Sequence, residues 1–384
     1  MKKLTPITML AIVKGLHMTL RTLTEASISA MRSRMLVVAT LLAIPAALAQ
    51  VKTGLPPLVP AAKPVTVVHI RVHSPAIAGN LEGEAADRDV IVFLPPGYEH
   101  DKSRRYPVVY ALHGFFIGAE EWTHEIHVPQ TIEGAFAKGS RPMIVVLPDS
   151  KTIYGGSMYS RSATTGDFER FIAHDLVAYI DAHYRTIPDR RSRGLVGHSM
   201  GGYGAVRIGM QHPGVFGSLY VMSPCCLSSA AMKPMDAATE KAIRALKSPT
   251  DSATLPWYTH PQLALAAAWS PDPKKPPLYL DLPFENGVVQ PEVAAKWSAN
   301  EPLAFIDQYI DDLREYRAIS IDVGDQDDLR FDAAKLHTIL DSYGISNSFT
   351  IYHGTHTSAV AYRFQDHVLP FFSRTLCFAR CDQK

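Results

Sequence analysis

Short apolar runs alternate with amphipathic stretches along most of this chain. The runs are rich in β-branched residues and predict strands at 65–72, 89–94, 106–112, 142–147, 194–196, 215–222, 317–323 and 348–352. Between them, apolar positions recur with helical period, most clearly at 168–184 and 332–343. This alternation indicates an α/β fold with a mostly parallel central sheet, an antiparallel start and helices on both faces.

The alternation of strands and helices stops between about residues 225 and 316. This interval is rich in proline and holds short helical patches and several aromatic residues. It predicts a lid-like insertion over the carboxyl ends of the strands. The domain organisation that follows is a proline-rich linker at 50–64, one domain at 65–376 that contains the insertion, and a C-terminal tail at 377–384.

The first 49 residues have the pattern of a secretory signal peptide. Residues 31–35 are basic, residues 36–45 are apolar, and Ala47-Leu48-Ala49 is a small-residue cleavage site before Gln50. The true start is either Met31 or a longer positive region that includes residues 1–30. We therefore expect a secreted or periplasmic protein whose mature form has no integral membrane span; an uncleaved N-terminal anchor is the alternative.

Composition and charge narrow the class of partner. The chain has 384 residues, a net charge of +1 and 47% hydrophobic residues, which is typical of a soluble globular protein. The near-zero net charge gives no reason to expect nucleic acid or an anionic membrane as a partner.

The four cysteines are Cys225, Cys226, Cys377 and Cys381. Export permits disulfides, and the last two lie close enough to close a small loop in the tail. One of the first two either reaches the tail or stays a free thiol. No C-x-x-C pair and no third ligand for His124 and His127 is present, so we expect no metal and no cofactor.

The stretch 193–207 carries the strongest chemical signal. Gly197-His198-Ser199-Met200-Gly201 matches G-x-S-x-G between an apolar strand and a helix rich in small residues. In that context the turn holds the serine hydroxyl exposed at the tip of the strand, and the flanking glycines avoid collisions. Ser199 is therefore the predicted nucleophile.

A serine nucleophile needs a histidine base and an acid that orients the base. In this kind of chain the acid follows the serine and the histidine comes last. Asp327 is the predicted acid, with Asp325 and Asp328 as alternatives, because all three follow the strand at 317–323. His356 is the predicted base, and His353, closer to its strand, is expected to be structural.

Two backbone N–H groups are expected to form the oxyanion hole. Met200 lies at the start of a helix, where the first N–H groups have no partner within the helix. The second donor is expected after the strand at 106–112, in His113-Gly114-Phe115, from Phe115 or, failing that, Phe116. His113 is expected to brace the loop.

Several of these motifs together resemble a known family. Pro95-Pro96-Gly97-Tyr98, the run from Arg105 to Gly114, Trp122 and Gly197 to Gly202 look like the esterase D-type branch of the α/β-hydrolases. That branch includes S-formylglutathione hydrolases, feruloyl and acetylxylan esterases, tributyrin esterases, siderophore esterases and mycolyltransferase antigens. The resemblance covers about 65–375.

The resemblance implies an α/β-hydrolase fold. It also implies that Ser199, Asp327 and His356 are the catalytic triad, with Phe115 and Met200 as oxyanion donors. Two departures matter: S-formylglutathione hydrolases are cytoplasmic whereas this chain carries an export signal, and mycolyltransferases generally carry Glu where Asp327 stands.

The function expected is a secreted serine esterase that acts on a small-molecule or carbohydrate ester through an acyl-enzyme. An acyltransferase with an alcohol or sugar acceptor, a thioesterase similar to S-formylglutathione hydrolase, and a binding protein without activity are the alternatives. Six aromatic residues either line a pocket for a phenolic or sugar ester or pack in the core and lid: Tyr154, Tyr159, Trp257, Tyr258, Trp269 and Trp297.

Overall fold

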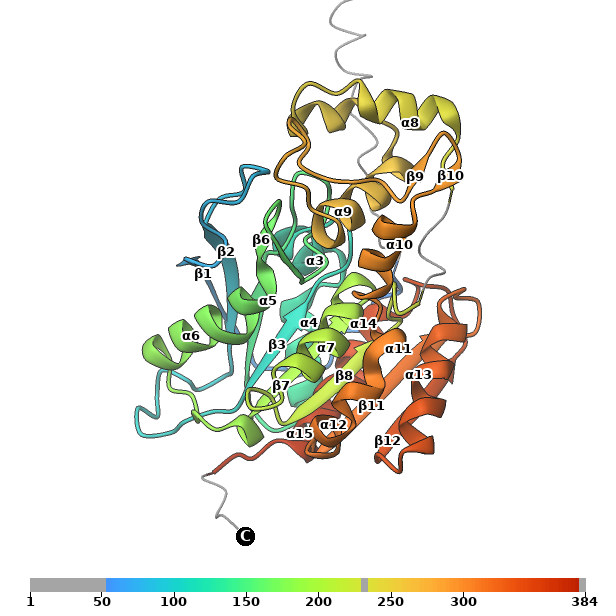
Figure 1. Cartoon of the computed structure of the whole chain (residues 1–384). Coiled ribbons are helices and arrows are strands. Elements are labelled where there is room, and N and C mark those ends of the chain that lie inside the picture. Colours follow the sequence, from blue (N-terminus) through green and yellow to red (C-terminus); the bar gives the residue numbers. More distant parts are fainter. Residues whose placement is uncertain (1–52, 229–233, 380–384) are drawn as a thin grey trace, which may run out of the picture. The chain divides into compact units, whose positions relative to one another are not determined.

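A computed structural model describes residues 53–228 and 234–379, and in this part eight strands form one sheet (Figure 1). The spatial order is β1-β2-β4-β3-β7-β8-β11-β12. The strands are β1 (Thr66–His73), β2 (Asp87–Leu94), β3 (Val108–Leu112), β4 (Ile144–Pro148), β7 (Arg193–His198), β8 (Ser218–Met222), β11 (Ala318–Gly324) and β12 (Asn347–Tyr352). All eight predicted strands are confirmed, with small shifts at their ends.

The strand directions match the sequence-based expectation. β1 pairs antiparallel with β2, and β2 pairs antiparallel with β4. Every later pairing in the sheet, from β4·β3 to β11·β12, is parallel. The carboxyl ends of β3, β7, β8, β11 and β12 therefore meet along one edge, where an α/β sheet places its site.

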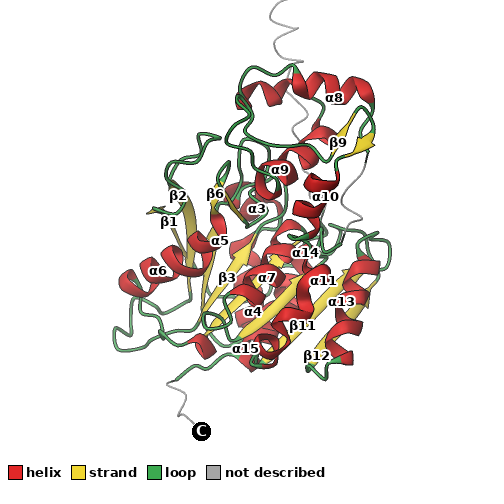
Figure 2. Ribbon diagram, viewed as in Figure 1, coloured by secondary structure: helices red, strands yellow, loops and turns green. Residues whose placement is uncertain are grey.

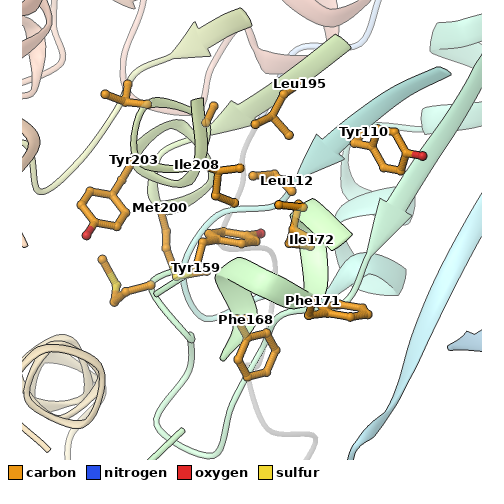
Figure 3. Close-up of a cluster of buried hydrophobic side chains, with 14 of the residues drawn as sticks. Tyr110, Leu112, Tyr159, Phe168, Phe171, Ile172, Leu195, Met200, Tyr203 and Ile208 are labelled. Atoms are coloured by element: carbon orange, nitrogen blue, oxygen red, sulfur yellow. The ribbon is translucent and has the colours of Figure 1, made fainter. Parts of the chain in front are cut away.

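Helices cover both faces of the sheet, because successive strand residues point to opposite sides. The helices over one face are α5 (Phe168–Arg170), the π-helical η1 (Phe171–Leu176), α6 (Val177–His183), α7 (Met200–Gln211) and α13 (Arg330–Ser342). Those over the other are α3 (Ala119–Glu125), α4 (Val128–Ala137), α14 (Val360–Arg363), η7 (Phe364–Val368) and α15 (Leu369–Thr375). Figure 3 shows the first core, where Leu112, Leu195 and Ile208 lie among aromatic rings.

The segment predicted as an insertion holds short helices and a small two-stranded sheet (Figure 2). They are α8 (Ala237–Arg244), η4 (Pro249–Thr254), η5 (Trp257–Thr259), α9 (His260–Trp269), β9 (Phe284–Glu285), β10 (Val288–Val289), α10 (Pro291–Ser298), α11 (Pro302–Phe305), η6 (Ile306–Tyr309) and α12 (Ile310–Arg314). Trp269 Nε1 donates to Ser160 Oγ at 3.3 Å, and Tyr203 Oη donates to the Asn300 carbonyl at 2.8 Å. A hairpin of β5 (Arg161–Ser162) and β6 (Gly166–Asp167) lies beneath α9, and η2 (Arg190–Ser192) precedes β7.

The ends of the chain carry two further predictions. The predicted signal peptide at 1–49 lies outside the described residues. Among the described residues, no helix is both long and apolar enough to span a bilayer. Cys377 is disulfide-bonded, while Cys225 and Cys226 are free thiols, so the suggested link from one of them to the tail is wrong.

Candidate active site

Ser199 occupies a sharp turn between β7 and α7. Its backbone has φ 59° and ψ −115°, a strained conformation for a residue with a side chain. The turn is so tight that a Cβ at Gly197 would lie 2.0 Å from the carbonyl oxygen of Gly201. A Cβ at Gly201 would lie 2.1 Å from the carbonyl oxygen of Leu112 in β3. The glycines of the motif thus allow the backbone approach that presents the serine hydroxyl.

The structure brings Ser199, His356 and Asp327 into one hydrogen-bonded line. His356 Nε2 lies 2.9 Å from Ser199 Oγ, and His356 Nδ1 lies 2.8 Å from Asp327 Oδ2. Since a carboxylate only accepts, Nδ1 carries the proton and Nε2 is free to accept the proton of the hydroxyl. This arrangement is the one that activates a serine for nucleophilic attack.

The loops that carry the acid and the base meet because β11 and β12 are parallel neighbours. Gly324 pairs with Tyr352 at the end of the ladder. The two loops that follow these strands come close together. A Cβ at Gly324 would lie 2.2 Å from the Gly354 carbonyl oxygen, and the Gln326 N–H donates to that oxygen at 3.0 Å. The absence of a side chain at Gly324 lets the loops touch through their backbones.

Asp327 is held as a buried carboxylate. Its side chain is only 3% exposed, and its Oδ1 accepts the Leu329 N–H at 3.0 Å. Burial by itself raises the pKa of Asp327, but the hydrogen bond and charge of His356, with the Leu329 N–H, outweigh it and lower the pKa below its ordinary value. The group thus keeps its charge opposite the imidazole.

The other two candidate acids lie elsewhere. Asp325 pairs with the exposed His353, whose Nδ1 lies 3.0 Å from Asp325 Oδ2, and it accepts the Gly354 N–H at 3.0 Å. Asp328 is exposed and lies 3.5 Å from an Arg330 nitrogen. Neither carboxylate has a hydrogen bond to His356, so the geometry selects Asp327 among the three.

His198, which sequence reasoning passed over, supports the loop of the base. Its Nε2 donates to the His356 carbonyl at 2.8 Å, and the two rings lie 4.8 Å apart. Burial lowers the pKa of His198 to about 3, with the neighbouring His356 adding to the effect. His198 is thus a neutral donor. The signal in the sequence was its position directly before the predicted nucleophile Ser199 in the G-x-S-x-G motif.

Two backbone N–H groups near Ser199 remain without an acceptor. Within the described residues, neither the Phe115 N–H nor the Met200 N–H makes a hydrogen bond. The Phe116 N–H, the alternative to Phe115, donates to the Gly155 carbonyl at 2.8 Å and is therefore occupied. Among the described residues, both predicted donors, Phe115 and Met200, therefore have an N–H that is free to bind an oxyanion.

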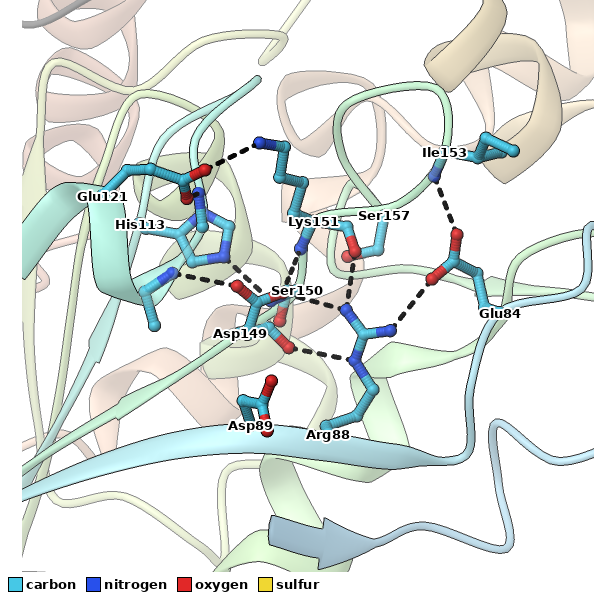
Figure 4. Close-up of polar contacts among 12 residues, drawn as sticks. Glu84, Arg88, Asp89, His113, Glu121, Asp149, Ser150, Lys151, Ile153 and Ser157 are labelled. Atoms are coloured by element: carbon cyan, nitrogen blue, oxygen red, sulfur yellow. Dashed lines mark hydrogen bonds and ion pairs between the residues drawn. The ribbon is translucent and has the colours of Figure 1, made fainter. Parts of the chain in front are cut away.

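The loop after β4 supports the Phe115 segment. The Ser150 N–H donates to His113 Nε2 at 2.8 Å, so His113 Nδ1 carries the proton and donates to the Gly114 carbonyl at 2.8 Å. Figure 4 shows this contact beside a second one, in which Arg88 binds Asp149 at 2.9 Å. His113 therefore braces two loops at once, as the sequence suggested.

The six aromatic residues proposed for a pocket divide into two groups. Four are buried at 3% exposure or less and belong to the core: Tyr154, Tyr159, Trp269 and Trp297. For these four, core packing is the correct interpretation and the pocket is wrong. Trp257 and Tyr258 are exposed on the insertion.

Comparisons with known proteins identify relatives of this chain. The family described as "Putative esterase" matches residues 85–376. An endo-1,4-beta-xylanase/feruloyl esterase of Xylanibacter ruminicola is 31% identical over 132 residues, which are 33% of this chain and 18% of that protein. Esterase Rv1288 of Mycobacterium tuberculosis is 30% identical over 135 residues, 34% of this chain and 27% of that protein.

These two relatives are much longer than the stretch they share with this chain, which spans under a third of either. Among solved structures, a ferulic acid esterase superposes with a TM-score of 0.55 at 22% identity, covering 82% of this chain and 100% of that one. At that identity the likeness establishes the α/β-hydrolase fold.

Proposed function

This chain belongs to the esterase family of α/β-hydrolases, and we propose that it is a secreted serine esterase whose nucleophile is Ser199. The observation that carries the proposal is the line of hydrogen bonds from Ser199 through His356 to Asp327, at 2.9 and 2.8 Å. The family supports the reaction class, and the geometry supports the proposed residues and roles.

Acylation begins when Ser199 Oγ attacks the ester carbonyl carbon and His356 Nε2 takes the hydroxyl proton. Asp327 stays ionised, holds the imidazole in the required tautomer and stabilises the imidazolium that forms. When the tetrahedral intermediate collapses, the bond to the leaving oxygen breaks. His356 then returns the proton to that oxygen, so an alcohol departs and an acyl-serine remains.

Deacylation repeats the sequence with water. His356 removes a proton from the attacking water, and the new tetrahedral intermediate expels Ser199 Oγ, which takes the proton back. The products are a carboxylic acid and the free enzyme. An alcohol in place of water would yield a new ester, which is the acyltransferase alternative.

The N–H groups of Phe115 and Met200 are the proposed oxyanion hole. Both are free of other acceptors in the described part of the chain. Backbone donors of this kind stabilise the negative oxygen of each tetrahedral intermediate, and loss of one donor costs about 3–4 kcal/mol in related sites. Because both are backbone groups held by the ends of β3 and β7, they need no reorganisation during the reaction.

The test is hydrolysis of p-nitrophenyl esters, from acetate to dodecanoate, by the chain from Gln50 onward. Ser199→Ala should retain the fold and lose turnover, and a fluorophosphonate should label the wild type at Ser199 alone. Full activity in Ser199→Ala would overturn the proposal. Inclusion of an alcohol during turnover measures acyl transfer directly, because captured acyl groups appear as a new ester instead of acid.

Substrate and location are also proposals. A relative named as a feruloyl esterase supports an ester of a phenolic acid or a sugar. The basic, apolar and small-residue pattern at 31–49 supports export. Export is tested by the N-terminus of the protein recovered from the culture medium or periplasm, where Gln50 is the expected first residue.

A further inference from the structure

Two adjacent aromatic residues are exposed on the insertion. Trp257 and Tyr258 are 70% and 58% exposed, and their rings meet edge to face with centroids 6.4 Å apart. The other three tryptophans are at most 3% exposed: Trp122, Trp269 and Trp297. Exposed aromatic clusters on a soluble protein mark binding surfaces more often than other surface does, since large rings gain much by leaving water.

The turn that carries the pair is held in place from below. The Thr259 N–H and Thr259 Oγ1 both donate to the Pro256 carbonyl, at 3.0 and 2.7 Å. His260 Nδ1 lies 3.3 Å from the same oxygen, and both Thr259 and His260 are buried. The two rings therefore project from a fixed backbone, which lowers the entropy cost of binding a partner.

The same turn contacts the oxyanion loop, defined as residues 113–116, which carries the proposed oxyanion donor Phe115. The His260 ring meets the Phe116 ring edge to face, with centroids 5.3 Å apart. Phe116 in turn lies 5.9 Å from the ring of Phe115, whose N–H is a proposed oxyanion donor. Only one residue separates Tyr258 from His260, so the exposed pair lies beside the oxyanion loop and not at a remote part of the insertion.

The surroundings of the pair distinguish the kinds of partner. Residues 249–262 contain no lysine or arginine and a single acid, Asp251. Membrane-binding segments combine a broad apolar face with basic residues, and phosphate-bearing partners need cations. Here two aromatic rings stand among the exposed Thr254 and Pro256. Aromatic faces, with their negative π density, attract the polarised C–H groups of a sugar ring while its hydroxyls stay in water.

We propose that Trp257 and Tyr258 form a stacking platform for the sugar rings of a neutral polysaccharide that carries the ester cleaved at Ser199. The inference rests on the proposed esterase function and adds to it a binding surface outside the triad and the oxyanion hole. The platform binds the polymer next to the oxyanion loop, so it raises the rate on polymeric esters without taking part in the chemistry.

The experiment compares two esters that give the same acetyl-enzyme: acetylated xylan and p-nitrophenyl acetate. Trp257→Ala should lower kcat/KM on acetylated xylan about tenfold, as loss of an aromatic anchor does at other interfaces. Tyr258→Ala should act in the same direction. Both variants should leave p-nitrophenyl acetate unchanged, because deacylation and the triad are untouched. Trp257→Phe keeps an aromatic face and should restore most of the loss.

Tyr343→Ala is the matched control, since Tyr343 is another exposed aromatic residue, at the end of α13 remote from the Asp327 loop. It should change neither rate. A second readout is independent of turnover: the Ser199→Ala protein should be retarded in a native gel that contains xylan, and the added Trp257→Ala change should abolish that retardation.

The outcomes separate this inference from the proposed function. No Ser199-dependent hydrolysis of any ester would overturn the esterase proposal itself. Normal hydrolysis of p-nitrophenyl acetate, with no gel retardation and equal rates for Trp257→Ala and wild type on acetylated xylan, would overturn the platform alone. A Trp257→Ala loss confined to emulsified tributyrin would also overturn it, because it would identify a lipid surface as the partner.

Discussion

Replacing Asp327 by Asn tests the assignment of the acid most directly. The amide still offers an oxygen to the Leu329 N–H, which Asp327 Oδ1 accepts at 3.0 Å, so the loop should keep its conformation. On the other side, the amide NH2 would face His356 Nδ1, now 2.8 Å from a carboxylate oxygen. Two donors cannot bond to each other, so the imidazole would move its proton to Nε2 and could no longer accept from Ser199.

The expected fall in kcat follows from that change of tautomer. Loss of the correct tautomer with the geometry intact lowers kcat by about ten-thousand-fold in serine hydrolases. At about 1.36 kcal/mol per factor of ten, this is close to 5.5 kcal/mol of transition-state stabilisation. The assay is steady-state hydrolysis of p-nitrophenyl acetate, with thermal unfolding to show that the variant is folded.

The neighbouring carboxylates provide matched controls. Asp325→Asn removes the partner of the exposed His353, and Asp328→Asn changes an exposed side chain. Both should keep kcat near that of the wild type, because neither contacts His356. A folded Asp327→Asn enzyme within tenfold of wild-type kcat, or an equal loss in Asp325→Asn, would refute the reasoning.

Two further predictions concern the support of the site, and a third concerns a buried carboxyl group. His198→Leu removes the donor to the His356 carbonyl and should cost about 1–3 kcal/mol of unfolding free energy together with a fall in kcat, whereas His198→Gln, which can donate, should recover part of both. Gly201→Ala places a Cβ 2.1 Å from a β3 carbonyl oxygen and should cost about 4 kcal/mol or more, or prevent folding, in a comparison of soluble yield and urea midpoint. Burial raises the pKa of Glu82 to about 8, so the folded protein favours the protonated acid. The free energy of unfolding should therefore be highest below the unfolded pKa, near 4.5, and should fall as pH rises toward 8. Glu82→Gln should remove this loss in urea titrations at several pH values.

Each of these has an outcome that contradicts it. A stable and fully active His198→Leu enzyme would show that the loop needs no such donor. Gly214→Ala is the control for Gly201→Ala, since a Cβ at Gly214 meets nothing within 4 Å, and equal effects of the two would argue against the backbone collision. For Glu82, parallel pH profiles of wild type and Gln variant would show that this carboxyl does not titrate with folding.

Local patterns determined much of this protein from the sequence alone. Eight apolar runs with β-branched residues became the eight strands of the sheet, because such residues fit a pleated surface that is at least partly buried. The turn around Ser199 could also be predicted from the sequence, since Gly197 is required by a close backbone contact with Gly201, only four residues away. The helices α3 and α4 escaped prediction; their place is set by packing against the second core.

Other features depended on contacts between distant segments, which no local pattern encodes. The sequence favoured Asp327 but left Asp325 and Asp328 as alternatives, and only the tertiary structure shows which carboxylate lies against His356. Burial likewise divided six similar aromatic residues into four in the core and two at the surface. The sequence determined which chemistry the chain carries, and the tertiary structure decided which side chains meet, because meeting depends on distances in space and not along the chain.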